Sequence, residues 1–304
     1  MVVSNTQKGI LLASSAGIFW GIQGPVSQYL FAAVNLSPEW LMAVKMLLAG
    51  LAILLYVRIG QRQPITTIFK RPGDGFHLIA YVIFGLAAVQ YAYLLMVQAS
   101  NAATATVMQS LGTVMIVIIT VVFYRKYPRW QETTAVLVAL LGTWLLVTKG
   151  NLAHLAISPH ALLIGLVLAL SGAMQTLIPI KLINRYGSLM VIGWGMLLGG
   201  LIFSVINPVW QNTPPLTLSV ILGVGFIVLF GTILAYLCFT ASLKYISPTV
   251  AGLLDVFEPL SATLGAVLFL NTSFSGAETI GAILTISTVF ILALPFRFPS
   301  KKKL

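Results

Sequence analysis

Charged side chains are scarce in this sequence. Only 8% of its 304 residues are Asp, Glu, Lys or Arg, and only six are acidic. A soluble domain carries about 25% charged residues. Hydrophobic residues make up 59% of the chain, and the mean hydropathy is +1.00. This composition excludes a soluble globular domain and predicts an all-α polytopic membrane protein embedded in a lipid bilayer.

Cysteine and histidine are also rare. Cys238 is the single cysteine, which excludes an intrachain disulfide. His77, His154 and His160 fall in or near expected loops, so we expect no metal site and no cofactor in the membrane. The expected spans contain no Ser-His-Asp or Cys-His set, and no phosphate-binding Gly-Lys-Ser/Thr loop is present. The sequence therefore predicts neither an enzyme nor an ATP-driven pump.

Long apolar runs fill the chain. A helix that crosses a bilayer needs about 20 mostly apolar residues. The short gaps after the third and eighth runs predict tight hairpins. Divided at its polar, Pro and Gly residues, the sequence predicts ten transmembrane helices over 9–31, 38–57, 76–98, 101–123, 130–148, 160–184, 188–206, 216–238, 248–270 and 276–296.

Basic residues are distributed unevenly among the loops. Loops rich in Lys and Arg face the cytoplasm, so the larger share marks the inner side. A cytoplasmic N-terminus puts fifteen of the 17 basic residues inside, leaving Lys149 outside and Lys45 within a span. We therefore expect both termini to be cytoplasmic, in the cell membrane. The fifteen are Lys8, Arg58, Arg62, Lys70, Arg71, Arg125, Lys126, Arg129, Lys181, Arg185, Lys244, Arg297, Lys301, Lys302 and Lys303.

This distribution accounts for the net charge of +11 through membrane topology, so no nucleic-acid partner is expected. The basic C-terminal tail, which contains Lys301–Lys303, is expected either to rest against anionic headgroups or to act as a solubilising tail.

The two halves of the chain, 1–150 and 151–304, repeat each other. Because each half contains five expected spans, an odd number, the second copy must be inserted upside down. Inverted repeats of this kind are typical of transporters, whose substrate sites lie near the membrane midplane between the halves. The matching pairs of segments are 46–51 with 196–201, 17–25 with 171–179, and 101–113 with 247–259.

Several of these segments resemble the hallmarks of a known family. The stretch from Tyr236 through Pro248 to Pro259, and Gly17-Ile18-Phe19-Trp20-Gly21, are similar to motifs of the EamA family in the drug/metabolite transporter superfamily. The resemblance covers essentially the whole chain. It implies ten helices in two inverted five-helix repeats, a central cavity lined mainly by spans one to four and six to nine, and alternating access. The family often has a proline in span four where this chain has Gly112-Thr113, so the two gates are expected to flex differently.

Two carboxylates lie within the ninth expected span. Asp255 and Glu258 are three residues apart, close to one helical turn, so they are expected to share a face. A charged carboxylate at the bilayer centre costs at least about 2.5 kcal/mol, and such residues usually face a cavity or a partner. Pro259 removes a backbone donor beside them. We expect Glu258, assisted by Asp255, to couple transport to protons or cations, with structural ion pairing as the alternative.

Trp20, Trp194 and Lys45 lie deep in their expected spans. Tryptophan prefers membrane interfaces, so a central Trp indicates either a cavity wall or packing against small residues. The Lys45 ammonium is expected either to extend toward the outer surface near Glu39, or to pair with an acid of span nine or a substrate carboxylate.

Other deep polar residues complete the candidate substrate site. Their side chains need hydrogen-bond partners in lipid, which neighbouring helices or a wet cavity could supply. The candidate substrate-binding residues are Trp20, Lys45, Gln90, Tyr93, Gln109, Gln175, Trp194 and Tyr236, and the expected hinges are Gly24, Pro25, Pro179 and Pro259.

The sequence thus predicts a secondary active transporter, either a monomer or a homodimer, for small polar organic metabolites. The resemblance implies export of amino acids or related compounds as the leading hypothesis, since members of that family mostly export such metabolites, and uptake of an organic cation such as choline as the alternative. Outside transport, the alternatives are a membrane scaffold or a polytopic enzyme.

Overall fold

The chain folds as a helical bundle. The computed structural model describes residues 4–125, 130–151, 157–211, 213–246, 248–273 and 275–293, and these residues contain no β-strand. Eight helices of the described part are long and apolar enough to cross a membrane, and they coincide with eight of the ten expected ranges. They run over Asn5–Val34, Pro38–Gly60, Pro72–Ala99, Ala102–Phe123, Pro159–Tyr186, Ser188–Ile206, Leu218–Ser242 and Val250–Leu270.

The other two expected ranges also form helices, α6 (Trp130–Thr148) and α14 (Gly276–Ala293). Neither is among the eight candidate spans, so a total of ten membrane crossings stays a prediction. The placement of both termini in the cytoplasm is also still a prediction. Among the residues used for it, Lys126, Arg129, Arg297 and Lys301–Lys303 lie outside the described residues, as do His154 and the basic C-terminal tail.

Several spans are built from more than one helical segment. Pro179 lies at the break between two such segments, α7 and α8, and its hinge role stays a prediction. The segments are α1 (Asn5–Val34), α2 (Pro38–Leu55), η1 (Tyr56–Gly60), η2 (Ile65–Lys70), α3 (Pro72–Tyr81), η3 (Val82–Leu86), α4 (Ala87–Ala99), α5 (Ala102–Tyr124), α7 (Pro159–Leu177), α8 (Ile180–Tyr186), α9 (Ser188–Ile206), α10 (Leu218–Val228), η4 (Leu229–Leu234), α11 (Ala235–Ser242), α12 (Pro248–Leu254) and α13 (Phe257–Leu270).

Local sequence signals set the helix ends. Ser4 and Gln7 form a reciprocal capping box, so α1 begins four residues before the expected start. Asn35, in the left-handed conformation, ends it. The expected hairpin between α4 and α5 is present, and the Asn101 side chain accepts the backbone N–H of Thr104 to cap α5.

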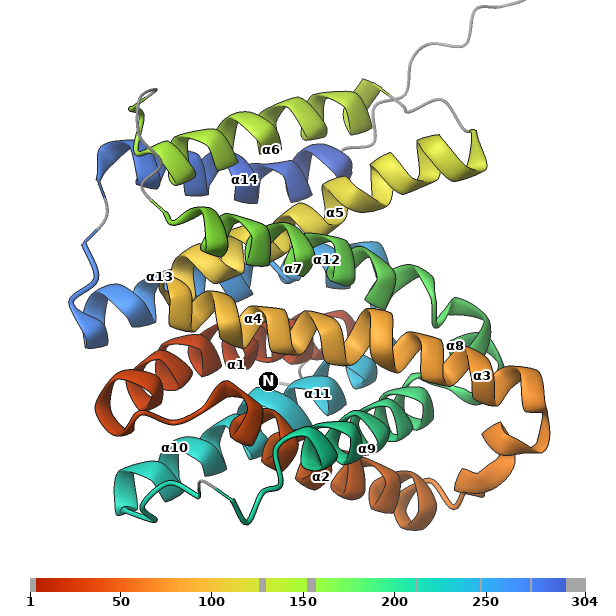
Figure 1. Cartoon of the computed structure of the whole chain (residues 1–304). Coiled ribbons are helices and arrows are strands. Elements are labelled where there is room, and N and C mark those ends of the chain that lie inside the picture. Colours follow the sequence, from red (N-terminus) through yellow and green to blue (C-terminus); the bar gives the residue numbers. More distant parts are fainter. Residues whose placement is uncertain are drawn as a thin grey trace, which may run out of the picture.

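Helices from the two expected halves pack against each other in a symmetric pattern. Figure 1 shows α6 beside α14 at the upper edge and α2 beside α9 near the lower edge. Each of these pairs joins a helix to its expected counterpart. Between them, α1 packs against α13 and α11, while α7 packs against α5 and α4. Exchanging the expected halves converts one set of contacts into the other, which is what halves related by a two-fold axis would produce.

Glycines allow the α2–α9 pair to approach closely. A Cβ at Gly200 would lie 2.6 Å from the backbone nitrogen of Leu47, and a Cβ at Gly50 would lie closer still to the backbone nitrogen of Leu197. Met46 and Met196 are completely buried beside them. The prediction that these repeated Gly and Met residues mark close helix packing is therefore confirmed.

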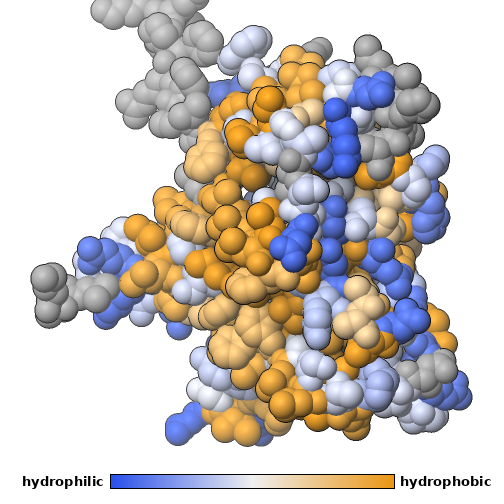
Figure 2. All heavy atoms as spheres, turned by 90° about the vertical axis from the view of Figure 1, so that its left-hand side faces the viewer, coloured by the Kyte–Doolittle hydropathy of each residue, from blue (hydrophilic) through white to orange (hydrophobic). Residues whose placement is uncertain are grey.

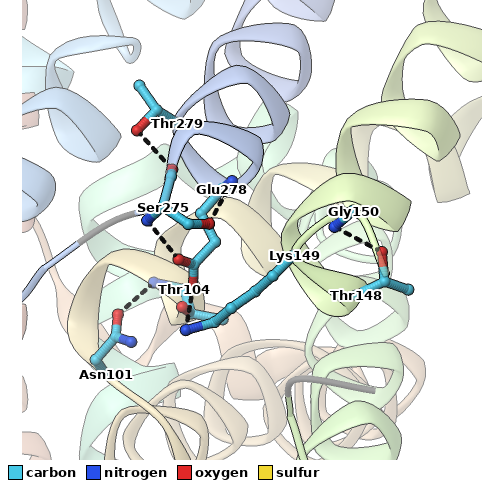
Figure 3. Close-up of polar contacts among 8 residues, drawn as sticks. All are labelled: Asn101, Thr104, Thr148, Lys149, Gly150, Ser275, Glu278 and Thr279. Carbon is cyan, nitrogen blue, oxygen red and sulfur yellow. Dashed lines mark hydrogen bonds and ion pairs between the residues drawn. The ribbon is translucent and has the colours of Figure 1, made fainter. Parts of the chain in front are cut away.

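The ends of α6 and α14 are joined by a polar contact (Figure 3). Lys149 Nζ lies 3.2 Å from Glu278 Oε1, and Glu278 Oε2 accepts the backbone N–H of Ser275 at 2.8 Å. Ser275 Oγ accepts the N–H of Glu278 in return, which completes a capping box at the start of α14. The one basic residue that the loop count leaves outside is thus held by an acid.

Apolar side chains remain on the surface, as the bilayer environment requires. Phe84, Phe123, Val205 and Leu268 each expose more than half of their area. Figure 2 views the molecule from the left of Figure 1 and shows hydrophobic side chains over a broad part of this face, interspersed with hydrophilic ones.

Candidate functional site

The ninth span is interrupted at the acidic pair. Helix α12 ends at Leu254 and α13 begins at Phe257. In a continuous helix, residue 259 would donate its N–H to the carbonyl oxygen of Asp255, but Pro259 has no N–H. That oxygen instead accepts the N–H of Glu258 at 2.9 Å. The predicted loosening of the helix by Pro259 is therefore confirmed.

The interruption does not move the two acids apart. The turn at Asp255-Val256 interrupts the helix, but the hydrogen bond from the Glu258 N–H to the Asp255 carbonyl spans three residues and keeps the two residues on one face, as expected. Asp255 is exposed, whereas only 8% of Glu258 is exposed. Both line the same cavity, as residues that share a face would.

Glu258 contacts the other expected half of the chain. Gln109 Nε2, on α5, donates to Glu258 Oε1 at 2.9 Å. The phenol groups of Tyr93 and Tyr236 lie within electrostatic range of this carboxylate. Helix α5 runs unbroken past Gly112, unlike the interrupted ninth span, so the backbones of the two equivalent spans differ as expected.

A second polar cluster surrounds Lys45. This side chain is 1% exposed, and its Nζ donates to Gln90 Oε1 at 2.6 Å. The alternative in which Lys45 reaches the outer surface near Glu39 is wrong, since the ammonium is buried and Glu39 instead accepts a hydrogen bond from Tyr91. Among the described residues no carboxylate lies within ion-pair distance of Lys45.

Gln90 connects Lys45 to an aromatic cluster. The Tyr236 hydroxyl lies close to the Gln90 side chain. Tyr236 and Phe239 lie on α11 and both contact Trp20 of α1. The Tyr236 ring packs edge-on against the Trp20 ring with 5.2 Å between centroids, and the Phe239 ring centroid lies 5.5 Å from that of Trp20. Four candidate substrate-binding residues, Trp20, Lys45, Gln90 and Tyr236, thus form one connected group between α1, α2, α4 and α11.

Trp194 lies elsewhere. Its Nε1 donates to the carbonyl oxygen of Ile65 at 2.8 Å, and its ring packs edge-on against Phe69. Both partners belong to η2, the short helix between the second and third spans. In this conformation Trp194 packs and hydrogen-bonds η2 against α9, and it does not contact the group around Trp20.

The expected hinges near the middle of α1 are packed. Pro25 lies inside a continuous α1, where its ring contacts the site of Gly265 on α13. Gly24 faces the Tyr93 hydroxyl and Ala102. Helices α1, α4 and α5 approach closely at Gly24, which explains why a residue without a side chain stands there. The hinge roles of Gly24 and Pro25 stay predictions.

A large cavity of about 780 Å³ lies at the end of the molecule that the basic-residue count places in the cytoplasm. Sequence reasoning did not single out its lining, because much of it comes from loops and helix ends. The lining includes Gln61, Gln63, Thr67, Cys238, Thr240 and Lys244.

A small cavity of about 170 Å³ lies between α5, α7 and the break in the ninth span. Of the expected site residues, Gln109, Gln175, Asp255, Glu258 and Pro259 line it. The residues around Trp20, together with Tyr93 and Trp194, line neither cavity. The structure thus has an open cavity at one end and a small cavity at the acids, and the polar-aromatic group around Trp20 lies outside both.

The third and eighth spans each contain a π-helical segment, η3 and η4, at equivalent positions in the two expected halves. Thr232 Oγ1 donates to the carbonyl of Ile227, five residues earlier. Such segments often occur at functional sites. Sequence reasoning missed them, and the only visible signal is the Gly within each, Gly85 and Gly231.

Comparisons with known proteins agree with one another. A model of the EamA-like transporter family matches residues 7–148 and 160–294. The "Uncharacterized inner membrane transporter YicL" of Salmonella typhimurium is 35% identical over 295 residues, covering 97% of this chain and 98% of that protein. The "Uncharacterized transporter YwfM" of Bacillus subtilis is 26% identical and covers 92% of each chain. A solved structure at 16% identity has a TM-score of 0.65 over 93% of this chain and 96% of its own, which shows the fold alone.

Proposed function

Because this chain belongs to the EamA-like transporter family and is a multi-pass membrane transporter, we propose that it exports small polar organic metabolites, amino acids or related compounds, across the cell membrane. The proposed mechanism is secondary active transport by alternating access, with both termini in the cytoplasm. The observation that supports it best is Glu258, a buried carboxylate at an interrupted span that is bonded to the opposite half.

Glu258 is the proposed coupling residue because its charge state affects the contact between the halves. Hydrogen bonds to an ionised carboxylate are roughly twice as strong as neutral ones. Neutralising Glu258 with a proton, or compensating it with a cation, would therefore weaken the bond from Gln109 that joins α13 to α5. The break at Asp255-Val256 gives the backbone the freedom to respond.

The group around Lys45 is the proposed substrate site. A buried ammonium that donates to a neutral amide is poorly compensated, and a substrate carboxylate would supply the missing charge. The rings of Trp20 and Tyr236 beside it would contact an apolar side chain.

The large cavity is the proposed route from the cytoplasm. Its volume of about 780 Å³ falls within the range of small-molecule sites, about 300–1,000 Å³. Its charged lining residues, Arg185 and Lys244, are both basic and would attract substrates that carry a carboxylate.

An organic cation such as choline is the competing substrate. Aromatic faces attract such cations, but the Lys45 ammonium, one amide away from Tyr236, would repel them. Quenching of tryptophan fluorescence by amino acids and by choline compares the two, and we expect only the amino acids to saturate.

Exchange of Glu258 for Gln tests the proposal. Gln keeps the size of the side chain and an oxygen for Gln109 but cannot carry the charge, so we expect transport in proteoliposomes to be abolished, or uncoupled from the ion gradient, while the melting temperature is kept. Glu278→Gln is the matched control, because Glu278 pairs with Lys149 at one end of the bundle. Unaltered flux and unaltered gradient dependence in Glu258→Gln would refute the coupling role.

A further inference from the structure

The small cavity beside Glu258 is the wrong size for a metabolite. Small-molecule sites enclose about 300–1,000 Å³, whereas this cavity encloses about 170 Å³. One water molecule takes about 30 Å³ of liquid volume. The space therefore fits a small ion with a few waters.

Three of the four hydroxyl groups on its wall already donate their hydrogen to backbone carbonyls. Thr106 Oγ1 donates to the Ala102 carbonyl at 2.8 Å, and Ser110 Oγ donates to the carbonyl of Thr106 at 3.1 Å. On the facing helix, Thr176 Oγ1 donates to the carbonyl of Gly172 at 3.2 Å. A hydroxyl has one hydrogen and two lone pairs, so these groups present only acceptor oxygens to the cavity.

The remaining polar groups add further acceptors. Gln175 Oε1 is completely buried and has no hydrogen-bond partner. A buried acceptor without a donor is costly, so such groups in native structures call for an explanation. Asp255 and Glu258 contribute two carboxylates that lie within electrostatic range of each other. The cavity lining contains no Lys, Arg or His.

The other paired acids show what is missing here. Asp74 lies 2.6 Å from Arg185, and Glu278 lies 3.2 Å from Lys149. Within the described part of the chain, neither Asp255 nor Glu258 has such a cationic partner. Two carboxylates and a buried carbonyl oxygen around a space of ionic size match the oxygen-rich coordination of a hard cation.

We propose that this cavity binds a monovalent alkali cation, Na⁺, between the carboxylates of Asp255 and Glu258 and the Oε1 atom of Gln175. Neutral oxygens of Thr106, Ser110 and Thr176 would complete its surroundings. Ca²⁺ fits less well, because it takes six to eight oxygen ligands and commonly several carboxylates, and the described residues contain no group of three or more metal-ligating His, Cys, Asp or Glu side chains. The inference rests on the proposed function in that the ion would occupy the coupling site.

Binding of radioactive ²²Na⁺ to the purified full chain in detergent, at constant ionic strength with N-methyl-D-glucamine, tests the site without requiring transport. We expect saturable binding near one ion per chain, with weaker competition by K⁺. Binding should fall at least tenfold in Asp255→Asn and in Gln175→Leu.

Gln23→Leu is the matched control for the glutamine. Gln23 Oε1 is also buried without a partner, but Gln23 does not line this cavity, so its exchange should leave Na⁺ binding unchanged. Melting curves in N-methyl-D-glucamine verify that each variant is folded. The absence of saturable ²²Na⁺ binding to the wild-type chain, or equal binding by the folded Asp255→Asn variant, would overturn the inference.

Flux measurements separate this inference from the proposed function. Substrate flux driven by a proton gradient, without Na⁺ binding, would overturn the cation site and leave the transporter assignment standing. Saturable Na⁺ binding by a chain that moves no metabolite would support the site and overturn the proposed export function.

Discussion

At the scale of single residues, buried charges in the spans are held by glutamines. Lys45 donates to Gln90, and Glu258 accepts from Gln109. An amide orients a charge but does not neutralise it, so each charge remains available to a ligand. In contrast, Lys149 and Arg185, near the helix ends, pair directly with acids. In the described part of the chain, both ion pairs thus lie near helix ends, whereas Lys45 and Glu258 inside the bundle have no oppositely charged partner.

Exchange of Lys45 for Met should abolish binding of carboxylate-bearing ligands. Met keeps the length of the side chain and removes the ammonium, and replacing a buried charge with an apolar group need not destabilise the fold. We expect every metabolite that raises the melting temperature of the wild-type chain to lose this effect in Lys45→Met. Lys149→Met, which removes an exposed ammonium, is the control and should respond like the wild-type chain. A retained shift in Lys45→Met would show that Lys45 is not the anchor.

At the scale of elements, close backbone contacts determine which helix pairs can move. The α2–α9 crossing has backbone atoms within reach of the Cβ that either Gly50 or Gly200 would carry. The α6–α14 crossing has the same feature at Gly142 and Gly281. By contrast, the ninth span is interrupted and the third and eighth spans contain π-helical segments. Deformable elements therefore lie between two tightly interlocked pairs.

Exchange of Gly200 for Ala should destabilise the protein. The added methyl group would lie 2.6 Å from a backbone atom of α2, and such overpacking costs roughly 1–3 kcal/mol. Thermal unfolding should therefore occur at a lower temperature. Gly225→Ala is the control: Gly225 faces open space, and replacing a helical glycine with Ala gains up to about 1 kcal/mol. If the two variants shifted in the same direction, the close crossing would not be a stabilising contact.

At the scale of the whole molecule, an ion pair lies beside the mouth of the large cavity. Arg185 Nη1 and the Tyr186 hydroxyl both donate to Asp74 Oδ2, at 2.6 and 2.7 Å. Asp74 belongs to α3 in the first expected half, whereas Arg185 and Tyr186 belong to α8 in the second and line the cavity. This contact therefore limits how far the halves separate at that end.

Asp74→Asn should open the cavity and expose Cys238. Because Cys238 is the single cysteine and lines this cavity, its rate of labelling by a maleimide reports access. We expect the rate to rise a few-fold in the variant. Salt should raise the rate in the wild-type chain, since it screens an exposed ion pair, but much less in the variant. Glu278→Gln, which breaks the other ion pair, should leave labelling unchanged, and Cys238→Ser gives the background. Equal rates in Asp74→Asn and the wild-type chain would contradict a restraining role.

Much of the architecture was predictable because it follows from local chemistry. The lengths of the apolar runs in the sequence located the eight candidate spans. Pro259, which lacks an N–H, predicted where the helix of the ninth span is interrupted. The partners of the polar side chains were not predictable. Gln90 reaching Lys45, or Gln109 reaching Glu258, depends on how helices far apart in sequence are rotated and packed. Trp194 shows the same limit, since its depth in a helix does not reveal that it faces η2.

The large cavity and the π-helical segments were missed for a related reason. Loop residues such as Gln61 and Gln63 give no periodic signal, and a π-helical segment differs from an α-helix by one residue in a single turn. The division into two inverted halves remains a prediction, although the helix contacts repeat as such halves would require.

The glycine crossings restrict how any conformational change can proceed. Each joins one helix from each expected half, and the two lie at opposite edges of the bundle (Figure 1). Backbones locked together at two separated points cannot slide past each other without unfolding the contact, but they can still turn about the line that connects them. A rotation of this kind would keep both crossings intact and would change the packing between the helices that lie between them, which include α1 with Trp20 and α13 with Glu258.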